Sequence, residues 1–273
     1  MPCTPGGPGD GAAGTSNASP DQTLPRDLAA ALARLELRLG ATDSPADNPA
    51  RLGVSAVRLS PADGHAAAAA RDRIAWRPHE QFPAASTIKV YVLQALMERV
   101  AAGELDLASE LPVHASDMVT GSGVLKALTP GRRYPLLDLA TLMIVISDNT
   151  ATNVLIDAVG VERVNASVLS HGWRATHLSG KLQMSAAERG SRPSPSLTSP
   201  ADLLDYFARL WAGELLPPKL TQTCQRIYRQ QQFSELGRGL DHDPYSVEMG
   251  VAPWRIASKS GSLRGGRNDA GVF

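Results

Sequence analysis

The sequence has few of the residues that build disulfide frameworks or metal sites. It contains two cysteines, Cys3 and Cys224, in 273 residues, which is too few for a disulfide scaffold. Its six histidines are scattered, and no Cys/His cluster has the spacing of metal ligands. We therefore expect neither a metal site nor any other cofactor.

Net charge and long apolar runs are also lacking. Twenty-seven basic residues balance 27 acidic ones, so net charge predicts no nucleic-acid or acidic-membrane partner. The longest apolar run, Leu139 to Ile146, is far too short to cross a bilayer. Residues 1–22 have neither the basic nor the apolar region of a signal peptide. This leaves two alternatives, a cytoplasmic protein or an exported one whose signal is missing from this sequence.

The pattern along the chain predicts an α+β domain. Residues 1–24, rich in Gly, Pro, Ala and Ser, are expected to form a disordered tail, and residues 25–273 one domain. Leucines between Leu28 and Leu39 predict a first helix that Gly40 ends. Strand-like runs at 54–59 and 67–76 flank a turn and predict a hairpin. Helical patterns follow, and strands return near the end. We therefore expect a mainly antiparallel sheet built from both chain ends, packed against helices.

The segment Ser86-Thr87-Ile88-Lys89 begins a long helical run. Of the five lysines, Lys89 alone follows a serine by three positions, and this spacing places both side chains on one helix face. The helix N-terminus would favour negative charge at the serine oxygen. A lysine acts as a base only where burial or a nearby cation lowers its pKa. Taken alone, the motif is explained more often by the polar first turn of a buried helix.

Two further motifs change this interpretation. Ser147-Asp148-Asn149 lies between two predicted helices, where a loop presents side chains, although Asp148 is equally explained as a helix cap. Residues 259–261, Lys-Ser-Gly, follow a predicted strand. The lysine of that motif can hold a substrate carboxylate and can keep Lys89 partly deprotonated through like-charge repulsion. Its glycine lets a ligand approach the strand closely.

The three motifs occur in the order S-x-x-K, S-D-N and K-S-G, about 60 and then about 110 residues apart. That trio is found in class A β-lactamases and penicillin-binding proteins. From about residue 27 to Phe273, the chain resembles a class A β-lactamase. The resemblance extends to the surrounding text, FPAASTIKV, MVTGSGVL, LMIVISDNTATNVLID and SKSGSLRGGRND.

The resemblance implies the roles of the catalytic residues. Ser86 would be the acyl nucleophile, and Lys89 its proton acceptor or relay. Ser147 would pass the proton to the leaving nitrogen of a β-lactam ring. The backbone N–H groups of Ser86 and Ser262 would form the oxyanion hole. The active site would lie between the sheet and an all-helical lobe.

The resemblance also implies the substrate-binding residues. Asn149 would hydrogen-bond the acylamide side chain, and Lys259 and Ser260 would bind the ring carboxylate, with Gly261 beside them. Arg267 is a second cation for that carboxylate, or Arg264 serves instead, and both are equally explained as solvated turn arginines. The substrate would be a β-lactam or a peptidoglycan-like molecule. The chain is expected to be a monomer without a membrane span, and its family is exported.

One residue departs from the family pattern. In class A enzymes an Ω-loop glutamate activates the water that releases the acyl group. Counting forward from the S-D-N motif and back from Pro200 both place Gln183 at that position. Glutamine cannot accept a proton as a carboxylate does. Glu188 is an alternative base, although an exposed loop acid beside Arg189 is the commoner explanation. We therefore expect acylation with slow deacylation.

The missing glutamate keeps other functions open. A penicillin-binding-protein-like D-Ala-D-Ala peptidase or esterase shares the three motifs, and so does a β-lactam sensor that is acylated once and stays modified. The chain also ends at Phe273, inside a predicted strand, where family members continue with a further strand and a C-terminal helix. We expect this sequence to be truncated, which would leave an apolar sheet face and a strand edge uncovered.

Overall fold

The computed structural model describes residues 26–43, 50–59, 73–182, 195–240, 249–250 and 254–273. The predicted tail, Cys3, residues 67–72 of the predicted hairpin, Gln183 and Glu188 lie outside these residues. The helices are α1 (Arg26–Asp43), α2 (Lys89–Ala101), α3 (Leu136–Val145), α4 (Asn149–Val159), α5 (Val161–Ser170), α6 (Pro200–Ala212) and α7 (Pro218–Arg229). The strands are β1 (Val54–Val57), β2 (Arg73–Trp76), β3 (Phe82–Pro83), β4 (Glu110–Pro112), β5 (Arg133–Pro135), β6 (Leu197–Thr198), β7 (Ala257–Leu263) and β8 (Gly266–Val272).

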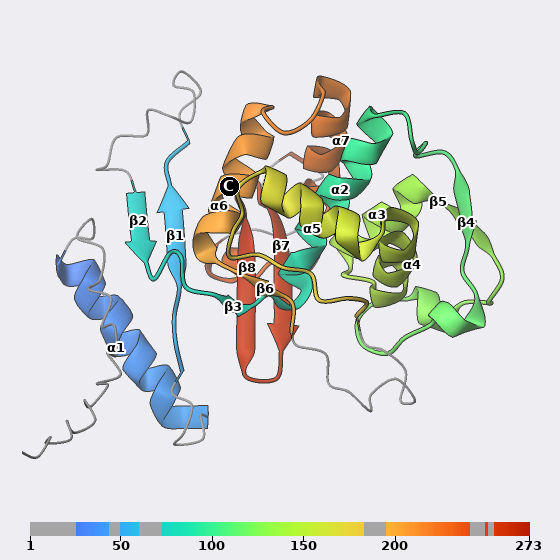
Figure 1. Ribbon diagram of the computed structural model, residues 1–273. Coiled ribbons are helices and arrows are strands. Elements are labelled where there is room, and N and C mark those ends of the chain that lie inside the picture. The colour runs from blue at the N-terminus through green and yellow to red at the C-terminus, as the bar shows by residue number, and fades with distance from the viewer. Residues whose placement is uncertain (1–25, 44–49, 60–72, 183–194, 241–248, 251–253) are drawn as a thin grey trace, which may run out of the picture.

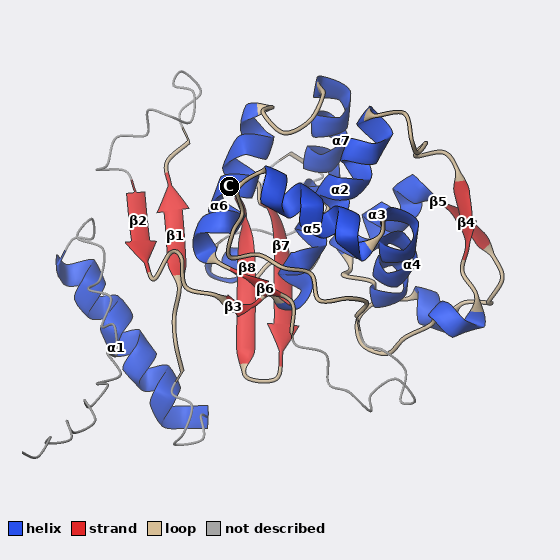
Figure 2. Ribbon diagram, in the orientation of Figure 1, coloured by secondary structure: helices blue, strands red, loops and turns tan. Residues whose placement is uncertain are grey.

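The α+β class is confirmed, with antiparallel strands from both ends of the chain. β1 pairs with β2, and β7 pairs with β8 in a longer hairpin. Among the described strands these are separate two-stranded ladders, as are β3–β6 and β4–β5. Helix α6 contacts both β1 and β8 and so connects the two hairpins through packing. Figure 2 shows β1 and β2 on one side of the β7–β8 hairpin and the helices α3, α4 and α5 on the other.

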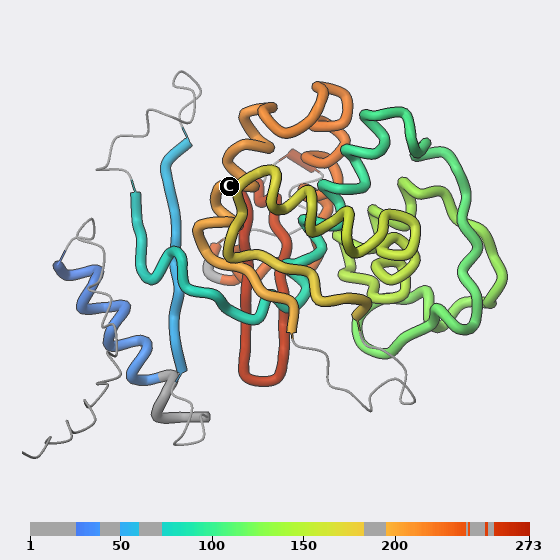
Figure 3. The backbone as a smooth tube through the Cα atoms, in the orientation of Figure 1, coloured from blue at the N-terminus to red at the C-terminus, as the bar shows by residue number. Residues whose placement is uncertain are grey.

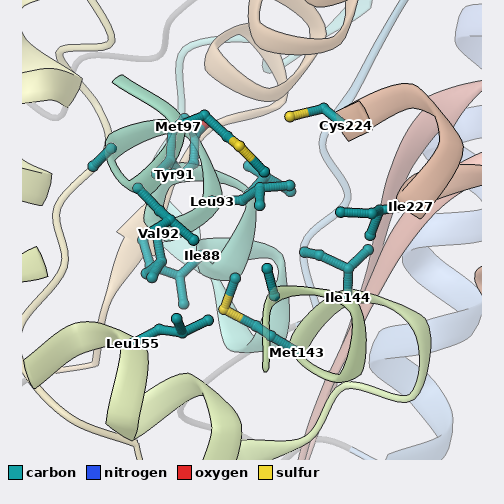
Figure 4. Close-up of a cluster of buried hydrophobic side chains, with 14 of the residues drawn as sticks. Ile88, Tyr91, Val92, Leu93, Met97, Met143, Ile144, Leu155, Cys224 and Ile227 are labelled. Carbon is teal, nitrogen blue, oxygen red and sulfur yellow. The ribbon is translucent and has the colours of Figure 1, made fainter. Parts of the chain in front are cut away.

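Helix α2 is at the centre of the core because almost every residue in its first nine positions is apolar. Residues 89–97 are all buried, and the helix contacts α3, α4, α5 and α7. In Figure 4, Tyr91, Leu93 and Met97 project from α2 among side chains of α3, α4 and α7. Each fully buried large apolar side chain contributes about 1.5–3 kcal/mol. The residues that precede α2 are therefore held on a rigid support.

Local sequence signals set most helix boundaries. Ser199 caps α6 by accepting a hydrogen bond from the Asp202 N–H at 3.1 Å, and Pro200 occupies the first turn as expected. The prediction that Gly40 ends the first helix is wrong, because α1 continues to Asp43. One glycine inside a helix costs only about 1 kcal/mol, which does not by itself terminate it. No described helix has the length and apolar character needed to span a membrane.

The course of the chain brings distant segments together. The tube in Figure 3 runs from α1 and β1 through the helical middle and returns in the β7–β8 hairpin. That hairpin lies against the turn Ala85–Ile88 that precedes α2, because both β7 and β8 contact the turn. The first and third sequence motifs therefore meet in space (Figure 1).

Candidate active site

Ser86 lies in a 3₁₀ turn, Ala85–Ile88, and the α-helix itself begins at Lys89. The sequence placed Ser86 in the first turn of the helix, so the structure inserts a tighter turn there. Ala85 has a φ of 50°, the left-handed region that non-glycine residues seldom adopt. Thr87 and Ile88 are buried and anchor the turn, whereas Ser86 is partly exposed. A strained backbone that presents an accessible hydroxyl is typical of a functional site.

The β7–β8 hairpin holds this turn in place. The Asn268 side-chain amide of β8 donates hydrogen bonds to the backbone oxygens of Pro83 and Ala84, at 2.7 and 3.1 Å. A Cβ atom at Gly261 would lie 2.8 Å from the Ser86 backbone nitrogen. Only glycine therefore fits where β7 passes the serine. The glycine thus makes room for the Ser86 turn, whereas the close approach of a ligand to Gly261 stays a prediction.

Lys89 connects the first two motifs. Its side chain is fully buried, and its Nζ donates hydrogen bonds to the Ser147 backbone oxygen at 2.8 Å and the Ser147 Oγ at 3.0 Å. A third hydrogen bond runs to the Asn149 Oδ1 at 2.8 Å. A lysine ammonium has a donor for each of the three acceptors, whereas a neutral amine has two donors and can accept from the Ser147 hydroxyl through its lone pair. Lys89 therefore brings the first motif into direct contact with the S-D-N loop.

The surroundings of Lys89 favour its neutral form. Burial lowers the pKa of Lys89 well below its usual value, and the positive charge of Lys259 lowers it further. The Asp148 carboxylate acts in the opposite direction and raises it. A neutral amine has a lone pair that accepts a proton, which an ammonium lacks. The Ser147 hydroxyl can rotate to donate to that lone pair or to accept from it.

Asp148 is a helix cap, which was one of its two explanations from the sequence. One carboxylate oxygen caps α4 by accepting from the Ala151 N–H at 3.0 Å. The other accepts from the N–H groups of Val124 and Leu125 at 2.6 and 2.9 Å. Both oxygens are thus used to join α4 to the segment at 123–125. Ser147, beside it, has a φ of 58°, and this strained backbone turns its hydroxyl towards Lys89.

Asn149 is also fixed by the segment that precedes α3. Its backbone N–H donates to the Ser122 oxygen at 3.0 Å, and its Nδ2 donates to the Thr120 oxygen at 3.1 Å. Its Oδ1 accepts from Lys89. An amide nitrogen carries two hydrogens, and within the described part of the chain Asn149 donates one of them, to Thr120. Binding of an acylamide by Asn149 stays a prediction.

Lys259 brings the second cation of the site. It is fully buried in β7, and its Nζ donates to the Ser260 backbone oxygen at 2.6 Å. Burial lowers the pKa of Lys259 to about 7, against an opposing effect of the Asp269 carboxylate. The charge of Lys259 acts on Lys89, as noted above, so the first and third motifs are electrostatically coupled. Ser260 is almost fully buried and Ser262 is exposed.

The two candidate arginines lie in or beside the β7–β8 turn. Both Arg264 and Arg267 are exposed. Arg267 donates to the backbone oxygens of Leu263 and Gly266 at 3.3 and 3.2 Å, which matches the explanation as a turn arginine. A substrate-binding role for either residue stays a prediction. The described residues contain no group of three or more His, Cys, Asp or Glu side chains placed to hold a metal.

Sequence reasoning assigned no role to Asn268 or Asp269. Asp269 accepts hydrogen bonds from the Ser234 hydroxyl and from the N–H groups of Glu235 and Leu236. Asparagine and aspartate are depleted in β-strands. The available signal was the presence of two such residues in a predicted strand, seven and eight residues after the last motif.

Comparisons with known proteins identify the family and the fold of the chain. The model of the Beta-lactamase enzyme family matches residues 46–273. A β-lactamase from Sphaerobacter thermophilus is 32% identical, with a TM-score of 0.64, over 73% of this chain and 71% of that one. A PBP-A variant, solved as an acyl-enzyme complex with penicillin G, is 27% identical, with a TM-score of 0.64, over 88% and 81%. An ancestral class A β-lactamase is 26% identical, with a TM-score of 0.67, over 90% and 84%.

Proposed function

Because the chain belongs to the beta-lactamase enzyme family, we propose that it opens β-lactam rings through an acyl-enzyme on Ser86. The observation that carries this proposal is the buried contact of Lys89 with Ser147 and Asn149, directly after the Ser86 turn. The acyl-enzyme that the similar PBP-A variant forms with penicillin G supports it as well.

In the proposed acylation, neutral Lys89 accepts the hydroxyl proton of Ser86, directly or through a water molecule. The serine oxygen attacks the ring carbonyl carbon and forms the new C–O bond, while the carbonyl oxygen becomes an oxyanion. The N–H groups of Ser86 and Ser262 stabilise that oxyanion. The C–N bond of the ring then breaks, and the proton passes from Lys89 through Ser147 to the leaving nitrogen. Every proton is thereby accounted for.

Substrate binding in this proposal uses the remaining motif residues. Protonated Lys259 and the Ser260 hydroxyl bind the ring carboxylate, and the second side-chain N–H of Asn149 donates to the acylamide oxygen. Lys259 has a second effect, because its positive charge lowers the pKa of Lys89. The same residue would therefore attract the substrate and help to keep the base unprotonated.

Deacylation is proposed to be slow. Gln183 occupies the sequence position where the family has its glutamate, and an amide cannot take a proton from the attacking water. This residue favours a second candidate function, that of a penicillin-binding-protein-like peptidase or a β-lactam sensor that stays acylated. These functions differ from a β-lactamase in the lifetime of the acyl-enzyme.

Stopped-flow measurement with nitrocefin, a chromogenic cephalosporin, and intact-mass detection of the protein distinguish these functions. We expect a burst close to one turnover, followed by slow release, with the acyl-enzyme as the main species. Gln183→Glu should speed the slow phase about a hundredfold, since a positioned general base typically contributes 10²–10⁴. The matched change Glu188→Gln should leave the slow phase unaltered. Fast steady turnover of the wild type, without accumulated acyl-enzyme, would contradict slow deacylation.

A further inference from the structure

Asn268 is a partly buried side chain of β8 that the proposed mechanism does not use. It pairs with Gly261 in the β7–β8 ladder, and residues paired across antiparallel strands project from the same face. The Asn268 side chain therefore lies on the face where Gly261 leaves room for the Ser86 turn. Both strands of the hairpin contact this turn.

The side-chain amide of Asn268 holds two consecutive carbonyl groups. Its Nδ2 donates to the backbone oxygens of Pro83 at 2.7 Å and Ala84 at 3.1 Å. An amide nitrogen carries two hydrogens, so each carbonyl receives one of them. Asn268 thereby fixes the direction of the chain at the end of β3, just before Ser86.

Ala84 is the residue from which the Ser86 turn begins. It is fully buried, and its N–H donates to the Ser196 oxygen at 2.8 Å. Its carbonyl oxygen accepts from the Thr87 N–H at 3.1 Å and from the Thr87 Oγ1 at 2.6 Å. These two contacts lie within the turn itself, whereas the contact from Asn268 comes from a strand 184 positions away. Asn268 therefore joins the turn to the hairpin.

The backbone between this anchor and Ser86 is strained. Ala85 has a φ of 50°, in the left-handed region where Cβ lies too close to a backbone carbonyl oxygen. Such a conformation persists only where the surrounding contacts over-determine it. Asn268 supplies two of these contacts directly before Ala85. Without them, we expect the Ala85 backbone to relax and the Ser86 N–H to move away from β7.

We propose that Asn268 is a positioning residue for Ser86, because its bridge to the Pro83 and Ala84 carbonyls holds the strained turn against β7. This inference rests on the proposed function, in which Ser86 is the nucleophile and its N–H belongs to the oxyanion hole. Asn268 itself touches no reacting atom in that scheme. It acts on the rate of acylation and not on the binding of the substrate, which depends on residues of the three motifs.

Asn268→Asp removes both N–H donors with almost no change in shape, since carboxylate oxygens only accept hydrogen bonds. We expect the rate constant for acylation of Ser86 to fall about a hundredfold, comparable to the loss of one oxyanion-hole donor. The dissociation constant of the preceding complex should stay within about twofold of the wild-type value. Both are measured by rapid quench over a range of concentrations of a fluorescent penicillin. An unchanged rate constant in the folded variant would overturn the proposal, and so would a weakened complex that reacts at the wild-type rate.

Nuclear magnetic resonance of the turn tests the positioning without any substrate. The dipeptide Ser-Thr occurs once in the sequence, at Ser86–Thr87. Serine labelled with ¹³C at its carbonyl, combined with ¹⁵N-labelled threonine, therefore selects the Thr87 amide, which closes the turn. Asn268→Asp should speed the hydrogen exchange of this amide about tenfold, because a loosened turn opens more often. Exchange at the wild-type rate in the folded variant would overturn the proposal.

Asn165→Asp is the matched control for a merely structural effect. Asn165 on α5 also holds a backbone segment by two hydrogen bonds. Its Nδ2 donates to the Leu178 oxygen at 2.9 Å, and its Oδ1 accepts from the Leu178 N–H at 2.8 Å. The substitution should lower the unfolding temperature but leave the Thr87 exchange and the acylation rate unchanged. Equal effects of the two substitutions would exclude a specific role of Asn268.

The wild type provides a test that needs no folded variant. The dipeptide Arg-Asn also occurs once, at Arg267–Asn268, so carbonyl-labelled arginine with ¹⁵N-labelled asparagine assigns Asn268. Its Nδ2 protons should exchange with water about tenfold more slowly than those of a free asparagine side chain, and equal exchange would overturn the proposal. A wild type that is not acylated at all would refute the proposed function, whereas the exchange of Thr87 would still decide whether Asn268 fixes the turn.

Discussion

Lys89→Met is expected to lower the rate of Ser86 acylation about a thousandfold, within the 10²–10⁴ that a positioned general base contributes. Methionine has a similar length and suits a buried position, but it has no lone pair on nitrogen to accept the serine proton. It also leaves the Ser147 Oγ and the Asn149 Oδ1 without the hydrogen bonds that Lys89 donates to them. The rate is measured by rapid quench with a fluorescent penicillin.

The control for this prediction is Lys219→Met, which removes an exposed lysine on α7. It should leave the acylation rate unchanged. Because unpaired buried acceptors cost about 1–3 kcal/mol each, the unfolding temperature of the Lys89 variant is measured alongside its rate. Acylation of a folded Lys89→Met protein at the wild-type rate would exclude Lys89 as the proton acceptor.

Gly261→Ala is expected to reduce kcat/KM for nitrocefin about a hundredfold, the typical effect of losing one oxyanion-hole donor. The added Cβ would lie 2.8 Å from the Ser86 nitrogen and 3.0 Å from the Thr87 nitrogen. Both atoms belong to the backbone and cannot move aside as a side chain would. The strand β7 must therefore shift away from the turn, which separates the N–H groups of Ser86 and Ser262.

Gly266→Ala is the matched change in the same hairpin. A Cβ there would approach only the Leu263 Cβ, at 4.0 Å, an ordinary van der Waals distance. This variant should retain the wild-type kcat/KM in the same assay. If the two alanine variants behaved alike, the close approach of β7 to Ser86 would have no part in catalysis.

The candidate residues that belong to the three short motifs could be named from the sequence. Ser86 and Lys89 are three positions apart at the start of one helical segment, and the cap at Asp148 follows from its place before α4. The helix limits also follow from local signals, as at Ser199 and Pro200. Gly40 is the exception, because a single glycine does not end a helix and α1 continues to Asp43.

The remainder of the site depends on contacts between distant residues. Asn268 holds Pro83 across 185 positions of the chain, and no local pattern encodes such a pairing. The left-handed backbone of Ala85 likewise has no signature in its methyl side chain, because the surrounding packing imposes it. The hydrogen bonds of Asp269 to the turn at 234–236 span 33 to 35 positions and have no local signature either.

The most direct test of the acyl-enzyme is intact-mass spectrometry of the wild type and Ser86→Ala after brief exposure to benzylpenicillin. We predict that the wild type gains the mass of one complete penicillin molecule, because ring opening releases no fragment, and that peptide mapping locates it on Ser86. The Ser86→Ala protein should gain none. An adduct of equal extent on Ser86→Ala, or an unmodified folded wild type, would contradict the account.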